Sequence, residues 1–318
     1  MKRPVILSGS HDPACNLALE EELVERGEPV LYLWSNEPAV VIGRNQNPYK
    51  ECDLEKLRAD GVHLMRRRSG GGAVYHDRGN LNFTLISPRR EDNTRENFDF
   101  VRAVLARCGV DAQVSGRNDL TVGEKKISGS AFFENEQIFC HHGTLLVDLD
   151  MNRLGNYLTA SPLKLQAKGI DSVRARVENL SALRPGLTVD AVVQAFCEEW
   201  NSGVDRISEE DILEDCAIRK RVEKYRSWEW TFGECPRFNV SLEEKFSWGL
   251  LEADLYVESG QVKTCKIFTD SIIDENFNEL AASLEGEPLK PEKLCAHVRE
   301  HIGNEQLRQD LLGLFAKV

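Results

Sequence analysis

The sequence contains no long apolar run and no paired cysteines, and both absences exclude classes of protein. Its nine cysteines stand singly, so neither a zinc ribbon nor a C-x-x-C redox motif is present. No apolar run approaches the roughly 20 residues needed to cross a bilayer. The N-terminus turns polar at Ser8, which is too early for a secretory signal. We therefore expect a cytoplasmic protein with reduced thiols and no membrane partner.

Excess positive charge is also missing, since the formal net charge is −12. A protein that binds a nucleic-acid backbone needs a broad basic surface, so we expect no nucleic-acid partner. A local basic pocket for a small anion remains compatible with this charge. The catalytic motifs G-x-S-x-G and H-E-x-x-H and the Walker sequence are absent as well.

The chain is long enough for one large domain and one small one. Its 318 residues are 41% hydrophobic and 29% charged, as in ordinary globular proteins. The pattern changes near residues 239–242, after which two alternating strands meet at Gly260 and three helical patterns follow. The helical patterns cover residues 271–284, 291–302 and 306–315. We expect a catalytic domain over residues 1–238 and a small α+β domain over residues 242–318.

Periodicity in the first part predicts strands and helices in mixed order. The predictions that matter below are a helix over Ala14–Arg26 begun by Asp12-Pro13, a hairpin of Val30–Trp34 and Ala39–Gly43, a single helix over Glu209–Tyr225, and a functional loop over Ser161–Leu180. The glutamates of the first helix are expected mostly on its outer side.

The most unusual stretch is Arg66–Asn80, where three arginines run into Ser69 and then into three consecutive glycines. Such a triplet loses much backbone entropy on ordering, so it needs a reason. Without Cβ atoms, backbone N–H groups can approach a phosphate or a carboxylate, and the arginines supply the countercharge. The alternative is a glycine hairpin beside a solvated basic strand.

A second informative run is Ser115–Ala131. A Gly123-Glu124 turn joins two strands there, and the second strand carries Lys126 just before a series of small residues. A lysine together with arginines and backbone amides stabilises charge on a carboxylate and an α-phosphate. Asp119, beside Asn118, can hold Mg²⁺, which usually takes one or two carboxylates plus phosphates. The alternative for Lys126 is an exposed strand lysine.

Two histidine-containing pairs lie on predicted strands. His76 is followed by Asp77, and His141 by His142. Adjacent strand residues point to opposite faces, so neither pair can act as a dyad with itself. We expect no metal cage from these residues alone.

Taken together, these motifs resemble the lipoate–protein ligase A family. The residues that carry the likeness are Arg66–Asn80, Gly116–Leu120, Lys126–Ala131, His141–Leu146 and Lys168–Leu180. Shorter matches are Asn16-Leu17-Ala18 with Glu20-Glu21, Val40–Arg44, Gln46-Asn47-Pro48, Trp228-Glu229-Trp230 and Phe246–Gly249. The likeness covers essentially the whole chain, which makes it far more specific than any single motif.

The resemblance implies an α+β fold, with a class II synthetase or biotin-protein-ligase-like mixed β-sheet catalytic domain and a small α+β C-terminal domain. It implies ATP, Mg²⁺ and lipoate as ligands. Lipoate would be activated to lipoyl-AMP with release of pyrophosphate. The lipoyl group would then pass to a lysine of the lipoyl domains of 2-oxoacid dehydrogenase E2 subunits or of the glycine-cleavage H protein. We expect a monomer.

The resemblance also implies roles by position. Lys126 would be the catalytic residue, in contact with both the adenylate and lipoate. The nucleotide would contact Arg67, Gly72, Ala73, Val74, Tyr75 and Lys126. Lipoate would contact Lys126, Arg67, Ser69, Gly70, Gly71, His76 and His142. Asn118 and Asp119 would lie near the phosphates and Mg²⁺, and the loop over 161–180 would close over the adenylate.

The residues leave other functions open. A lipoyl or octanoyl transferase of the same fold would use preformed acyl-AMP or an acyl-carrier donor, and a carrier-dependent enzyme would need a thiolate. Cys140 is the cysteine near the site, although a small buried cysteine is the ordinary interpretation in mid-strand. A biotin ligase would show a different glycine–arginine signature. A non-catalytic lipoate carrier would need neither the arginines nor Asp119.

Overall fold

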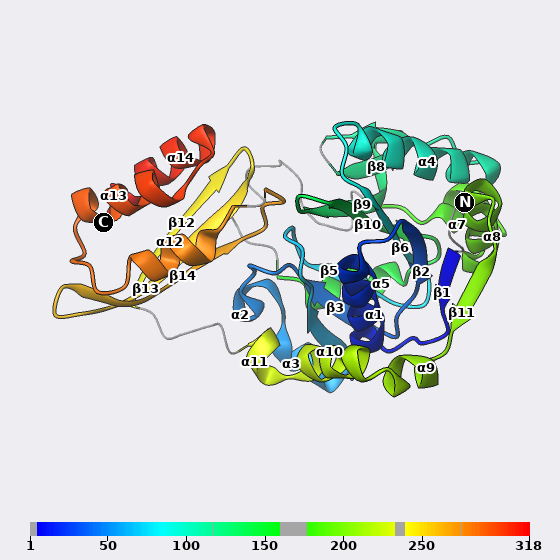
Figure 1. Cartoon of the computed structure of the whole chain (residues 1–318), viewed down its shortest axis with the longest axis horizontal. Helices are drawn as coiled ribbons and strands as arrows, with labels where there is room; N and C mark the ends of the chain where they lie inside the picture. Colours follow the sequence, from blue (N-terminus) through cyan, green and yellow to red (C-terminus); the bar gives the residue numbers. More distant parts are fainter. Residues whose placement is uncertain (1–4, 117, 160–176, 233–238, 274) are drawn as a thin grey trace.

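The computed structural model describes residues 5–116, 118–159, 177–232, 239–273 and 275–318, and Figure 1 shows their arrangement. The first part of the chain is built on a sheet of eight strands and a second sheet of three strands. The second part, from Val240 onward, has a three-stranded sheet of its own and a separate hydrophobic core. Among the described residues, no helix is long and apolar enough to cross a membrane.

The large sheet is mixed, in the order β11-β1-β2-β6-β10-β9-β8-β7. Its strands are β1 Val5–Ser8, β2 Val30–Trp34, β6 Asn80–Pro88, β7 Gln113–Ser115, β8 Asp119–Val122, β9 Lys125–Glu134, β10 Ile138–Leu146 and β11 Val204–Ile207. β1 is parallel to β2 and β11, and the other neighbouring pairs are antiparallel. The pairing of β8 with β9, and of β9 with β10, confirms the strands predicted around Lys126.

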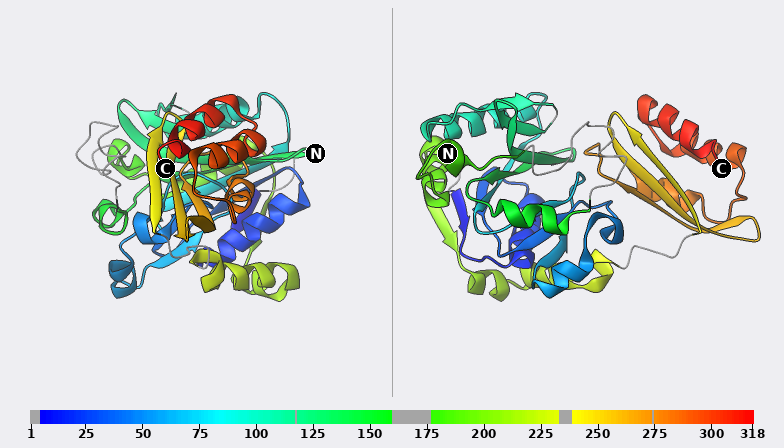
Figure 2. Two further views of the ribbon diagram at one scale, coloured as in Figure 1. Left: turned by 90° about the vertical axis from the view of Figure 1, so that its left-hand side faces the viewer. Right: turned by 180° about the vertical axis from the view of Figure 1, so that it is seen from behind.

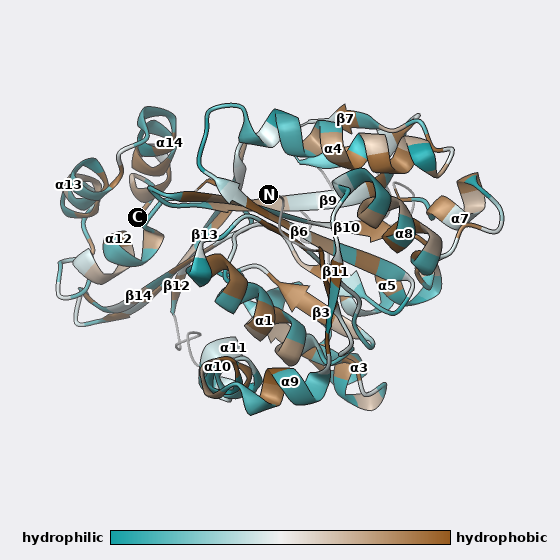
Figure 3. Ribbon diagram, turned by 45° about the vertical axis from the view of Figure 1, so that its right-hand side comes forward, coloured by the Kyte–Doolittle hydropathy of each residue, from teal (hydrophilic) through white to brown (hydrophobic). Residues whose placement is uncertain are grey.

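Helices cover both faces of this sheet. Those of the first part are α1 Pro13–Arg26, α2 Pro48–Glu51, α3 Leu54–Ala59, α4 Asn93–Arg107, α5 Met151–Tyr157, α7 Leu180–Leu183, α8 Val189–Trp200, α9 Glu209–Glu214, α10 Cys216–Arg226 and α11 Trp228–Thr231. Alternate side chains of a strand point to opposite faces. Leu31 and Leu33 therefore pack against α4 and α8, whereas Tyr32 and Trp34 pack with α1 and α10. Figure 3 shows the apolar strands between these helices.

The predicted hairpin of residues 30–43 is wrong. β3, Ala39–Ile42, does not pair with β2 but lies at the centre of the small sheet, parallel to β4 (His63–Arg66) and antiparallel to β5 (Val74–His76). β2 lies between β1 and β6 in the large sheet, and β3 lies between β4 and β5 in the small sheet. Because both strands are central in their sheets, all of their residues are buried. The polar turn at Pro38 carries the chain between the sheets. Arg66 and Val74 accordingly flank a loop between two strands that do not pair with each other.

Two helix predictions also need correction. α1 is capped by the Asp12 side chain and ends at Gly27, as expected, but Glu20 and Glu21 are buried rather than outside. α10 packs along α1, and its Lys224 contacts Glu21 at 2.5 Å. The predicted helix over 209–225 is broken, because the Asp215 side chain accepts hydrogen bonds from the amides that begin α10. The predicted loop over 161–180 lies mostly outside the described residues.

The second part packs helices on one face of its sheet, as the side views in Figure 2 show. Its elements are β12 Val240–Phe246, β13 Gly249–Glu258, β14 Gln261–Thr269, α12 Phe277–Ser283, α13 Pro291–His301 and α14 Glu305–Phe315. Leu251, Ala253 and Leu255 of β13 contribute to the core with the helices. The alternating strands and the last two helices confirm the predictions, whereas α12 begins later than expected, where Asn276 caps it.

Candidate active site

A cavity of about 160 Å³ lies where the two sheets of the first part meet. Helix α1 and strands of both sheets contribute to its wall, together with the glycine loop that joins β4 to β5. The lining residues are Leu17, Trp34, Val41, Arg67, Gly71, Gly72, Ala73, Val74, His76, Asn82, Asn118, Lys126, Gly129, Ser130, Ala131, His142, Gly143 and Thr144. The wall of the cavity therefore combines apolar residues with amide, imidazole and cationic groups.

The first arginine of the triplet is structural. The Arg66 side chain is fully buried and donates to the carbonyl oxygens of Gly43, Arg44 and Gln46. It also donates to the carbonyl oxygens of Trp230 and Thr231, and so ties the glycine loop to α11. A buried guanidinium needs acceptors for its five N–H groups, and here carbonyl oxygens of the chain supply them.

Arg67 holds the glycine loop in shape. Its guanidinium donates to the carbonyl oxygens of Gly70 at 2.6 Å and Gly72 at 2.9 Å, and to the Ser69 hydroxyl at 3.1 Å. Burial lowers the pKa of Arg67 to about 10, so the side chain stays cationic at neutral pH. Its positive charge is therefore part of the cavity wall, although its N–H groups are directed at the loop.

The three glycines have different surroundings. A Cβ at Gly70 would overlap the Ser271 carbonyl oxygen of the second part of the chain. Gly71 has a φ of +92°, and a Cβ there would lie 2.9 Å from Arg67 Nη2. Only Gly72 of the three would place a Cβ in open space. Close packing within the chain thus explains Gly70 and Gly71, and Gly72 is the glycine that leaves room for a ligand.

Lys126 lines the same cavity as Gly72. It belongs to β9, and its Nζ lies 2.8 Å from Asp119 Oδ1 across the β8–β9 pair. About a third of each side chain is exposed, at 35% and 31%. Asn118 Nδ2 donates to the Ser130 carbonyl oxygen at 2.9 Å, which fixes β9 beside the cavity. The lysine is therefore held at the cavity rather than free in solvent.

His142 connects α1 to the glycine loop. Its Nδ1 lies 2.9 Å from Glu20 Oε1, and its Nε2 lies 2.6 Å from the Ser69 hydroxyl. Burial opposes ionisation of Glu20, but contacts with His142, Thr84 and Arg67 hold its pKa below the usual value. A buried carboxylate, an imidazole and a hydroxyl thus form one hydrogen-bonded row, of which the imidazole lines the cavity.

Burial keeps the side chains of His76 and His141 neutral. Burial lowers the pKa of each to about 3. His76 Nδ1 accepts a hydrogen bond from Asn36 Nδ2 at 3.1 Å, and His76 lines the cavity. His141 instead lies among phenylalanine rings, with Phe132 at 4.7 Å between centroids. The opposite directions of His141 and His142 confirm that they form no dyad.

The structure brings most of the expected site residues to one cavity. Those in its wall are Arg67, Gly71, Gly72, Ala73, Val74, His76, Asn118, Lys126 and His142. Ser69, Gly70, Tyr75 and Asp119 lie behind the wall or beside it; the Tyr75 ring turns away and packs 5.6 Å from that of Tyr157. Arg117 lies outside the described residues.

Sequence reasoning missed Glu20, Trp34 and Asn82. Glu20 stands three residues after the inward-facing Leu17, and that helical spacing could have revealed it. Trp34 and Asn82 have no such signal, because their strands are buried on both faces.

Cys140 lies behind the cavity, not in its wall. It is buried, and burial together with the charge of Glu20 raises the pKa of its thiol well above the ordinary value. A nucleophilic cysteine needs a stabilised thiolate, so this thiol is a packing group.

The fold is thus a mixed sheet joined to a second small sheet, with a lysine-bearing pocket between them and a separate α+β unit after it. Residues 12–201 match the family model of the lipoyl protein ligase A/B catalytic domain, and residues 235–311 match that of the bacterial lipoate protein ligase C-terminus. The chain belongs to the lipoate–protein ligase A family of ligases, as its sequence motifs predict.

Relatives and solved structures agree with this assignment. The chain is 41% identical over 298 residues to the lipoate-protein ligase A of Bdellovibrio bacteriovorus, covering 90% of this chain and 88% of that protein. A P. falciparum LipL1 structure in complex with lipoate matches 99% of both chains, with 29% identity and a TM-score of 0.86. A structure of lipoate-protein ligase A bound with ATP matches 73% of this chain and 99% of the other, with 27% identity and a TM-score of 0.61.

Proposed function

We propose that this chain is an ATP-dependent lipoate–protein ligase, in which lipoate and ATP meet in the cavity between the two sheets. The observation that carries the proposal is the position of Lys126 in the same cavity wall as Gly72 and the apolar residues Leu17 and Trp34. The apolar residues suit an alkyl chain and a dithiolane ring, and Lys126 and the Gly72 backbone suit anionic groups.

In the first half-reaction the lipoate carboxylate attacks the α-phosphorus of ATP, and pyrophosphate leaves. Positioning and charge neutralisation dominate this kind of step. Lys126 lies in the cavity wall, where it would neutralise charge on both reacting groups. The buried positive charge of Arg67 would add to the positive potential in the cavity. The row from Glu20 through His142 to Ser69 keeps the glycine loop in place.

Mg²⁺ fits this site through one protein carboxylate. Asp119 is partly exposed beside Lys126, and Mg²⁺ usually needs only one or two carboxylates when phosphates supply the remaining oxygens. Asn118 lies in the wall next to it, with its amide nitrogen directed at Ser130. Asp119 would hold the ion, whose charge would offset that of the phosphates.

In the second half-reaction a lysine amine of the acceptor attacks the acyl carbon of lipoyl-AMP, and AMP leaves. No acyl group on the enzyme is needed, and the buried thiol of Cys140 supports this over a thiol-dependent transferase. A related solved structure is that of a bipartite lipoate protein ligase and its E2 lipoyl domain from Thermoplasma acidophilum. We infer that the acceptors of this chain are E2 lipoyl domains and the H protein. We also infer that the enzyme is a cytoplasmic monomer with domains over residues 1–238 and 242–318.

The test is pyrophosphate release from lipoate and MgATP. Lys126→Ala should lower that rate by about two orders of magnitude or more, because it removes a cation that stabilises the transition state. Lys125→Ala, one residue earlier and exposed, is the matched control and should leave the rate close to that of the wild type. A near-normal rate in Lys126→Ala would remove the site assignment. A wild-type chain that releases no pyrophosphate from lipoate and MgATP, yet transfers the lipoyl group from preformed lipoyl-AMP with release of AMP, would instead be a lipoyl transferase.

A further inference from the structure

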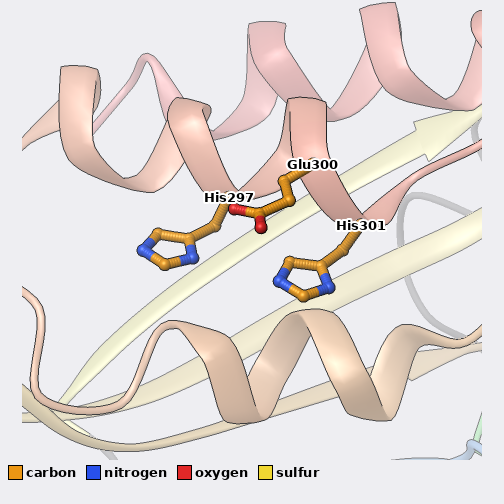
Figure 4. A group of neighbouring side chains, drawn as sticks. All are labelled: His297, Glu300 and His301. Atoms are coloured by element: carbon orange, nitrogen blue, oxygen red, sulfur yellow. The ribbon is translucent and has the colours of Figure 1, made fainter.

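Helix α13 carries a group of metal-binding side chains that the ligase chemistry does not use. The nitrogens of His297 and His301 and a carboxylate oxygen of Glu300 all lie within 4.8 Å of one another. Among the described residues, these three are the histidine, cysteine or acidic side chains whose ligand atoms lie close enough together to hold one metal ion. Figure 4 shows both imidazole rings projecting from the same side of the helix, with Glu300 between them.

The spacing of the three residues produces this arrangement. Residues three and four apart lie on one face of a helix, so His297, Glu300 and His301 share a side. The helix is anchored by the buried residues Leu294 and Val298, which keeps that spacing in place. The two imidazole rings are nearly parallel, with 7° between their planes and 6.2 Å between their centroids.

Two further observations show that the group is more than a chance pair of histidines. Glu287, in the turn before α13, has a carboxylate oxygen 3.6 Å from His297 Nε2. That turn is held by backbone hydrogen bonds between Glu287 and both Val262 and Leu284. The other ring nitrogen, His297 Nδ1, is buried and has no hydrogen-bond partner in the described structure. A fourth ligand, a second carboxylate oxygen, is thus available from a fixed segment.

We propose that these residues form a site for Zn²⁺ or a similar transition-metal ion in the second part of the chain. Two imidazoles with carboxylates are a donor set for such ions, whereas Mg²⁺ and Ca²⁺ prefer oxygen alone. Donor atoms on a tetrahedral zinc lie roughly 3.3 Å apart, so rotations about the side-chain bonds suffice to close the site. The ion would join α13 to the turn at Glu287.

The site is separate from the catalytic cavity, because none of its residues lines that cavity. Its expected effect is on the fold of the second part. An ion that binds only the folded chain shifts the unfolding equilibrium toward the folded state. The proposal does not depend on the ligase assignment, and its tests need neither lipoate nor ATP.

The experiment titrates Zn²⁺ by calorimetry into the full chain, stripped of metal with a chelator and free of lipoate and nucleotide. One ion should bind per chain. His297→Ala and His301→Ala should each weaken binding about tenfold or more, as expected when a ligand is lost. His63→Ala, which removes an exposed histidine in the first part, should bind as the wild type does.

A second measurement separates lost binding from a damaged fold. Thermal unfolding of the wild type should shift to higher temperature with Zn²⁺, and Glu300→Gln, at an exposed position, should reduce the shift without changing the metal-free transition. Absorption of bound Co²⁺ should show tetrahedral coordination in the wild type and lose it in the histidine variants. Zn²⁺ affinity that is unchanged in both histidine variants, or the absence of saturable binding, would overturn the proposal.

Discussion

The two parts of the chain differ in what they bury. Beside the cavity between the two sheets, the first part buries charged side chains such as Glu20, Arg66 and Arg67, and each is held by several hydrogen bonds. The core of the second part is apolar, and its buried carboxylates, Glu252 and Asp254, lie on the other face of the sheet, toward Lys50.

This difference separates a region built for binding from one built by packing. Buried charges cost free energy unless they are fully partnered. In the first part they shape the glycine loop and place cationic charge beside the cavity. In the second part stability comes mainly from apolar burial between sheet and helices.

The largest effect is expected for Arg66→Ala. The change removes five hydrogen bonds to buried or partly buried carbonyl oxygens, and we expect it to lower the free energy of unfolding by roughly 4 kcal/mol or more. Urea denaturation followed by circular dichroism measures this loss. Arg68→Ala is the control, since its partly exposed guanidinium pairs with Glu25 and should contribute about 1 kcal/mol or less. Equal losses in the two variants would contradict the structural role of Arg66.

A packing change in the second part should affect stability without affecting chemistry. Leu280 of α12 is fully buried, and Leu280→Ala should lower the free energy of unfolding by about 3 kcal/mol. Pyrophosphate release at a temperature where the chain stays folded should remain close to that of the wild type. Leu183→Ala, at an exposed position of the first part, should change neither quantity. If Leu280→Ala abolished adenylate formation in the folded chain, the two parts could not be treated as separate in function.

Two adjacent glycines should respond differently to the same substitution. Gly71→Ala forces a side chain into the left-handed region against Arg67 and should cost about 1–2 kcal/mol of stability. Gly72→Ala meets open space and should change stability by less than about 0.5 kcal/mol, yet it should weaken ATP binding by filling the ligand side of the loop. Denaturation and calorimetric ATP titration of both variants measure the contrast. Unchanged ATP affinity in Gly72→Ala would remove that glycine from the nucleotide site.

Two buried carboxyls, one in each part, should differ in how stability depends on pH. Burial and the neighbouring Asp254 raise the pKa of Glu252 to about 8. Its contribution to stability is therefore complete below the unfolded value near 4.5 and is lost as the pH rises toward 8. Glu20 has a lowered pKa, so its contribution is present above 4.5 and is lost as the pH falls.

Denaturation curves at a series of pH values test this difference. Glu252→Gln should flatten the decline of stability between pH 4.5 and 8, because the glutamine cannot titrate. Glu20→Gln should act on the acid side instead. If both variants changed the same limb of the profile, the opposite environments of the two carboxyls would be wrong.

Local patterns predicted many elements correctly. Asp12-Pro13 marked the start of α1, the turn at Gly123 marked the β8–β9 pair, and the turn at Gly260 marked the β13–β14 pair. In each case the residues that determine the structure lie within a few positions of it, so a short stretch of sequence is sufficient. The motifs around Arg67 and Lys126 likewise pointed to residues that line one cavity, and the binding of anions there stays a prediction.

By itself the sequence determined the helix starts, the tight turns, the family and the residue types of the site, because these depend on neighbouring residues or on an ordered set of motifs. The tertiary structure alone decided that β2 and β3 join different sheets, that Glu20 is buried against His142, and that Arg66 and Arg67 bond to the backbone of the glycine loop. It also decided that Gly70 faces Ser271 and that Glu287 approaches His297. The physical reason is that strand pairing, burial and hydrogen-bond partners depend on which distant segments meet, and local spacing carries no record of those meetings.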